Sequence, residues 1–70
     1  MKFQLQFTKV FSETREKRGI TMREVYEAAG INEATLYRAL SNNGETLAMP
    51  TFIAICAALG LDPRKCWVRQ

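Results

Sequence analysis

Apolar side chains recur every three or four residues along most of the chain, which predicts amphipathic helices. In the first helix Phe7, Val10 and Phe11 lie on one face. A later stretch, residues 51–59, is apolar nearly all round, so we expect it to form the central helix. We predict five helical segments: one ending near residue 18, then about 22–29, about 33–42, roughly 51–59, and a short basic segment, 64–70.

The expected helix boundaries carry local signals. Glycine tolerates the left-handed conformation just past a helix end, because it has no Cβ to clash there. All four glycines fall at such places: Gly19, Gly30, Gly44 and Gly60. Thr21 followed by Glu24 predicts a capping box, and Asn32 can cap the next helix. In that helix we expect Leu36 and Leu40 to be buried, with Ala39 close by.

The first residues, KFQLQF, alternate strictly between polar and apolar side chains. Phe3, Leu5 and Phe7 would share one side of a strand. Phe3 and Phe7 also fit a helix that extends the first one, whereas Leu5 fits only the strand. We favour the strand and keep the helix as the alternative. A lone strand needs a partner, most economically the same strand of a second chain.

A chain of 70 residues, 47% of them apolar, is expected to form a single globular domain over residues 1–70. No window is long and apolar enough to span a bilayer, and no signal peptide is visible, so we expect a cytoplasmic protein that does not bind membranes.

Candidate catalytic chemistry is sparse. The chain has two cysteines, Cys56 and Cys66, and no histidine, which falls short of the four ligands of a zinc site. We find no arrangement of side chains for acid–base or nucleophilic catalysis and no glycine-rich phosphate loop. We therefore expect neither an enzyme nor a bound metal or cofactor.

The net charge of +3 is compatible with a polyanionic partner. Cations gather before Glu24 and after Pro63, whereas between these two residues Arg38 is the only one. A surface that faces phosphates would therefore be assembled mostly from the flanks of the chain. A solvated surface of mixed charge is the alternative.

Only Gly30, Ile31 and Asn32 separate the second and third predicted helices. A turn of this length with a glycine sets two helices at a steep angle, as in a helix-turn-helix. The second helix of such a pair can enter a DNA major groove while the first crosses the backbone.

The runs REKRGITMREV, AAGINEATLYRAL and MPTFIAICAALGLDP also resemble the Cro/repressor-type helix-turn-helix family, often called XRE-like, which includes phage repressors and antitoxin-type regulators. The resemblance covers roughly residues 7–67. It implies an all-α, five-helix, lambda-repressor-like helix-turn-helix domain, to which our own reading of the first residues adds a short N-terminal β-strand. It also implies a homodimer that binds a double-stranded DNA operator. Tyr26 stands where the family has a small residue, so it must point outward or the two helices must splay.

By position, the resemblance implies two sets of DNA contacts. The base-contacting candidates are Glu33, Ala34, Thr35 and Arg38. The phosphate-contacting candidates are Thr21, Arg23, Ser41, Asn42 and Asn43. Arg38 is the strongest candidate, because arginine pairs with guanine through two hydrogen bonds. Some of these candidates have structural alternatives: Arg38 as a surface arginine paired with Glu33 or Glu45, Glu33 as a carboxylate that stabilises the helix dipole, Thr21 as a cap, and the two asparagines as turn residues.

The dimer interface is predicted to include Phe3, Leu5 and Trp67. Trp67 near the end of a small domain either closes the core or contacts a second subunit, and we favour the second. A rival function uses the same scaffold differently. In it the chain is a protein-binding module whose exposed apolar residues bind a toxin or a repressor.

Overall fold

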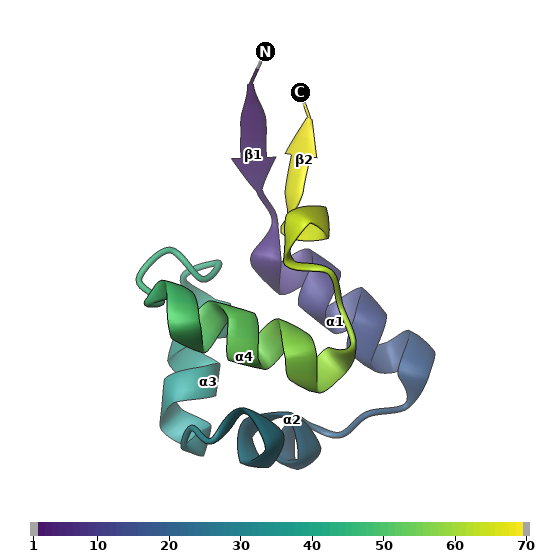
Figure 1. Ribbon diagram of the computed structural model, residues 1–70, viewed down its shortest axis with the longest axis vertical. Helices are drawn as coiled ribbons and strands as arrows, with labels where there is room; N and C mark the ends of the chain where they lie inside the picture. Colours follow the sequence, from purple (N-terminus) through teal and green to yellow (C-terminus); the bar gives the residue numbers. More distant parts are fainter. Residues whose placement is uncertain (1, 70) are drawn as a thin grey trace.

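The structure, a computed structural model, describes residues 2–69. Four α-helices stack beneath a small two-stranded sheet that projects from one end (Figure 1). In chain order the elements are β1 (Phe3–Leu5), α1 (Phe7–Arg18), α2 (Met22–Ala29), α3 (Glu33–Ser41), α4 (Met49–Leu59), the 3-10 turn η1 (Pro63–Cys66) and β2 (Trp67–Arg69). None of the helices described is long and apolar enough to cross a membrane.

The helix boundaries follow the local signals closely. Three helices end at a glycine in the left-handed conformation: Gly19 after α1, Gly30 after α2 and Gly60 after α4. Helix α4 begins at Met49, two residues earlier than predicted, because Pro50 is accepted in the first turn, where its missing N–H has no helical partner. Helix α3 ends at Ser41, one residue earlier than predicted.

The core lies between α4 and the three other helices, and η1 closes it. Its buried side chains are Phe7, Phe11, Val25, Leu36, Ala39, Phe52, Ile55, Cys56, Leu59, Leu61 and Cys66. The prediction for α3 was wrong in one respect, because Ala39 is fully buried whereas Leu40 lies only partly buried at the edge. Tyr26 also lies partly buried against the core, so it does not point fully outward.

The N-terminal strand is confirmed, but its partner is in the same chain. Strand β1 pairs antiparallel with β2, with Phe3 opposite Arg69 and Leu5 opposite Trp67. The backbone of β1 therefore finds its hydrogen-bonding partner within the chain, and the predicted pairing with a second chain is not needed for this. The fifth α-helix is replaced by η1 and β2. After Pro63 only one helical turn forms before the chain extends along β1, where backbone hydrogen bonds replace those of a helix.

Gly44 is the glycine that the packing constrains most. Its φ is +72°, and a Cβ there would lie 2.9 Å from the Phe7 ring. Gly19 has a similar φ of +66° but open space around it. We expect Gly19→Ala to lower the free energy of unfolding by about 1–2 kcal/mol through backbone strain alone. Gly44→Ala should lower it by roughly 2–5 kcal/mol, because overpacking adds to that strain.

Urea denaturation of both variants, followed by circular dichroism, measures this difference. Equal losses in the two variants would contradict the close packing of Gly44 on Phe7.

The two cysteines are free thiols, and both are buried. Burial raises the pKa of Cys56 to about 12 and also raises the pKa of Cys66. The thiolate is the reactive form, so both groups should be inert in the folded protein. We expect iodoacetamide at pH 8 to modify neither cysteine until denaturant is added, as intact mass spectrometry would show. Rapid alkylation of either thiol in the native protein would contradict this burial.

Candidate nucleic-acid interface

The junction of α2 and α3 is held by hydrogen bonds on both sides of a three-residue turn. The Gly30 N–H donates to the Glu27 carbonyl at 3.2 Å, and the Ile31 N–H donates to the Tyr26 carbonyl at 3.1 Å. Asn32 then accepts the Thr35 N–H at 2.8 Å and so caps α3. The end of one helix and the start of the next are thus both satisfied within the turn.

Packing of α2 on α4, and of α3 on α1, positions this pair of helices. Helix α2 lies mainly against α4 and makes fewer contacts with α3. Val25 of α2 and Leu36 of α3 are fully buried in the common core. The opposite side of α3 therefore remains at the surface of the molecule (Figure 1).

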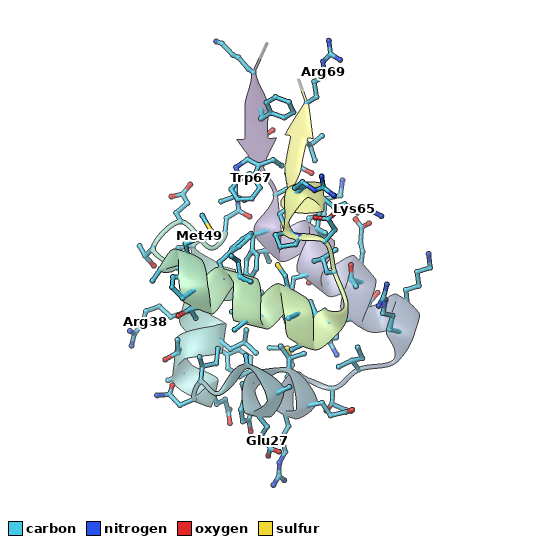
Figure 2. The ribbon with its side chains drawn as sticks, viewed as in Figure 1. Glu27, Arg38, Met49, Lys65, Trp67 and Arg69 are labelled. Carbon is cyan, nitrogen blue, oxygen red and sulfur yellow. The ribbon has the colours of Figure 1, made fainter. Side chains whose placement is uncertain are left out.

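Ala34 and Arg38 lie at the centre of the exposed face of α3. Successive helical residues turn by about 100°, which places both residues opposite Leu36 and Ala39. Arg38 extends away from the body (Figure 2). Within residues 2–69 the ion pairs are Arg23–Glu27 and Arg64–Asp62, so Arg38 is bridged to neither Glu33 nor Glu45.

Two other base-contact candidates flank this face. Glu33 is exposed in the first turn of α3, where a carboxylate also stabilises the helix dipole. The Thr35 hydroxyl donates to Asn32 Oδ1 at 2.9 Å. The Thr35 hydroxyl proton is therefore used within the cap, and what remains for a base contact is its methyl group or its oxygen as an acceptor.

At the start of α2, Thr21 and Glu24 form the predicted capping box. The Glu24 N–H donates to the Thr21 hydroxyl at 3.1 Å, and the Thr21 N–H donates to the Glu24 carboxylate at 3.1 Å. Arg23 beside them is exposed and pairs with Glu27, with 2.6 Å between Nε and Oε1. That hydrogen bond to the carboxylate raises the pKa of Arg23. A phosphate would have to compete with Glu27 for this guanidinium.

The polar residues at the end of α3 and just after it have internal partners. The Ser41 hydroxyl donates to the Arg38 carbonyl at 2.9 Å, and the Asn42 amide donates to the Thr46 hydroxyl at 2.8 Å. Asn42 Oδ1 is buried without a hydrogen-bond partner among the described residues. Ser41 is exposed and lies closest to the open face of α3.

Asn43 has a structural role that its sequence position did not show. Its Oδ1 accepts the Thr8 N–H at 3.1 Å, and its Nδ2 donates to the Leu5 carbonyl at 2.6 Å. The side chain thus ties the end of α3 to both β1 and α1. Its φ of +59° is a conformation that asparagine tolerates better than most residues. That tolerance was the only available signal, because both partners lie more than 30 positions away.

Arg15 and Arg18, two arginines near the end of α1, bind backbone carbonyls. Arg15 Nη1 donates to the Ile20 carbonyl at 3.2 Å, and Arg18 Nη1 donates to the Leu59 carbonyl at 2.9 Å. The second bond satisfies a carbonyl at the C-terminal end of α4, where a cation also favours the helix dipole. Both guanidinium groups are thus engaged within the chain, so they add less to a phosphate-facing surface than their number suggests.

The predicted dimer residues gather in the sheet, far from the α2–α3 junction. Strand β2 carries Trp67, whose ring centroid lies 5.3 Å from that of Phe52. Phe3 is 59% exposed, and Leu5 is partly buried. In the view of Figure 1 the sheet projects at one end of the long axis and α2 lies at the other. The structure therefore separates the candidate DNA contacts from the candidate dimer contacts.

Sequence reasoning missed Met49 and Ile53, which are 58% and 49% exposed on α4. Their spacing of four residues places them on the same side of the helix, and Phe52, which contacts Trp67, lies between them in the sequence. The nearly uniform apolar character of α4 concealed which of its side chains face outward.

Comparison with known proteins identifies one family. The family model for the Cro/C1-type HTH DNA-binding domain matches residues 11–64. No curated protein and no solved structure matches the chain. The matched region contains all of α2, α3 and α4 and most of α1. Because the match covers well over half of the 70 residues and includes the capped junction of α2 and α3, this chain belongs to the Cro/C1-type helix-turn-helix family of DNA-binding domains.

Proposed function

We propose that this protein is a sequence-specific, double-stranded DNA-binding regulator that works as a homodimer on a pseudo-palindromic operator. The role that fits best is a cytoplasmic repressor of the phage or antitoxin type, acting by occupying its site. The observation that carries the proposal is the position of Arg38, which is exposed at the centre of the open face of α3 and has no carboxylate partner among the described residues.

In this proposal α3 contacts bases and the start of α2 contacts phosphates. Helix α3 enters the major groove, where Arg38 donates to a guanine, while Ala34 and the Thr35 methyl group can meet thymine methyl groups. Glu33 can accept from a cytosine amine. Thr21 and Arg23 at the start of α2, and Ser41 at the end of α3, contact phosphates and fix the register without reading sequence. Asn42 and Asn43 are weaker phosphate candidates, because their side chains bond within the chain.

One observation favours the rival function. Met49, Ile53 and Trp67 expose apolar surface around Phe52, and exposed apolar patches often mark protein-binding sites. In the rival function this surface binds a toxin or a repressor, and DNA is not the target. The two functions differ in salt dependence, since affinity for DNA falls steeply with salt whereas apolar association does not.

Arg38→Ala tests the proposed reading directly. DNA selected from a random pool by the natural protein supplies the probe, and binding is measured by fluorescence anisotropy at several salt concentrations. The variant should lose about 1–3 kcal/mol of discrimination at one base position, or roughly 5- to 150-fold in relative affinity. Arg64→Ala is the matched control, because it removes another exposed arginine, one that lies outside α2 and α3. It should keep the sequence preference. Equal preference in both variants, or no selection of any sequence, would contradict the proposal.

Thr21→Asp separates the capping role of Thr21 from its phosphate role. Aspartate is at least as good an N-cap as threonine, so the free energy of unfolding should stay within about 0.5 kcal/mol. A carboxylate facing a phosphate should nevertheless lower DNA affinity by at least tenfold, equally for all sequences. Thr21→Ser, which keeps the hydroxyl, should change neither quantity. Unchanged DNA affinity in Thr21→Asp would remove Thr21 from the phosphate contacts.

A further inference from the structure

The outer edge of β2 offers unused backbone hydrogen-bonding groups. In an antiparallel pair, opposed residues alternate between those that bond to each other and those whose backbone groups point outward. The Gln6 N–H donates to the Cys66 carbonyl at 2.7 Å, which marks Gln6 and Cys66 as a bonded pair. By alternation from this pair, Trp67 and Arg69 point their backbone groups outward. The Trp67 N–H is taken by the Arg64 carbonyl in η1. The outward groups that remain include the Trp67 carbonyl and the Arg69 N–H.

The edge of β1 is less accessible than that of β2. The same alternation turns the Leu5 carbonyl outward, and there it accepts the Asn43 amide at 2.6 Å. The loop after α3 therefore covers the base of β1. A further strand could not run along this edge without displacing Asn43. On these grounds β2, and not β1, is the strand open to addition.

We propose that a second copy of this chain adds to the sheet through β2, which gives a four-stranded antiparallel sheet in the order β1, β2, β2 of the second copy, β1 of the second copy. The proposal rests on the homodimer of the proposed function. A two-fold axis at Val68 brings Trp67 of each chain opposite Arg69 of the other. The outward Arg69 N–H then meets the outward Trp67 carbonyl, twice by symmetry. The edge is thus complementary to itself.

The side chains support the same register. Residues opposite one another in an antiparallel pair project from the same face, so Phe3, Leu5, Trp67 and Arg69 share one face of the sheet. Addition of the second copy sets its Arg69 guanidinium beside the indole of Trp67, which is 38% exposed. A guanidinium against an indole face is a favourable cation–π pair. This register also places each arginine opposite a tryptophan instead of the other arginine. Val68, which is 39% exposed, would meet its own copy at the axis.

A contact built on three residues of each chain is small. It falls well below the roughly 800 Å² per partner of a stable interface, so the dimer should be weak, with a Kd on the order of 10–100 μM. Binding to two adjacent half-sites would hold two copies at a high effective concentration, and the dimer would then form on the DNA.

Arg69→Pro tests the proposal, because proline lacks the outward N–H and also removes the guanidinium. Proline is accepted on an edge strand where that N–H faces solvent, so the two-stranded sheet of β1 and β2 should still form. Phe3→Pro is the matched control. Phe3 lies opposite Arg69, and its N–H also points outward, but from the edge of β1. Sedimentation equilibrium up to about 1 mM covers the expected Kd range. Near-ultraviolet circular dichroism of Trp67 reports whether this sheet is intact.

The natural chain and Phe3→Pro should approach twice the monomer mass of 8.0 kDa at high concentration. Arg69→Pro should remain monomeric throughout, and Arg69→Ala should dimerise roughly tenfold more weakly, because both cation–π pairs are lost while the backbone hydrogen bonds remain. A monomeric natural chain would overturn the proposal. So would a dimer that survives Arg69→Pro, or one that Phe3→Pro abolishes. Loss of the dimer in Ile53→Ser, which changes the exposed side of α4 and not the sheet, would also overturn the proposal.

The same variants distinguish this inference from the DNA-binding proposal. If Arg69→Pro is monomeric and still binds a single half-site with the sequence preference that depends on Arg38, both stand. If the natural chain dimerises through β2 but binds no DNA at any salt concentration, DNA reading fails and the inference survives. If the natural chain reads DNA but stays monomeric in sedimentation equilibrium up to about 1 mM, the inference fails and DNA reading survives.

Discussion

Covering α4 is the constraint from which the arrangement of the other elements follows. No residue from Met49 to Leu59 is charged, so water is a poor partner for most of this helix. Helices α1 and α2 pack against it, η1 contacts it, and Phe52 lies between the rings of Phe7 and Trp67. Once α2 is held on α4, the short turn at Gly30 leaves α3 with one face in the core and the other open to a ligand.

The basic residues serve two different purposes, which their number alone does not reveal. Arg15 and Arg18 donate hydrogen bonds to backbone carbonyls, and Arg23 and Arg64 are held by carboxylates. Arg64 in turn holds the pKa of Asp62 down, to about 2, through their hydrogen bonds. Arg38 differs from these four because no such partner is found for it within residues 2–69. A modest excess of positive charge is therefore compatible with one well-placed cation on the reading surface.

Much of the fold could be predicted because its signals are local. The capping box at Thr21, the cap at Asn32 and the left-handed glycines each depend on residues within one turn, and all are confirmed. Features that depend on distant residues were missed. The partner of β1 lies more than 60 positions away, and the bonds of Asn43 span 35 and 38 positions. The DNA and dimer contacts stay predictions. The fold determines where an exposed side chain such as Arg38 lies, but only a complex with its ligand shows what that side chain binds.

The amide of Asn43 has a mechanical consequence. Its two hydrogen bonds join the end of α3 to β1 and to the start of α1. A tilt of the β1–β2 sheet relative to α3 would have to break the bond from this amide to Leu5, while the bond to Thr8 holds the same residue on α1. If two copies pair through their sheets as proposed above, this amide limits how far the two α3 helices can move apart. Half-sites at a different spacing would then be bound only with the loss of that hydrogen bond.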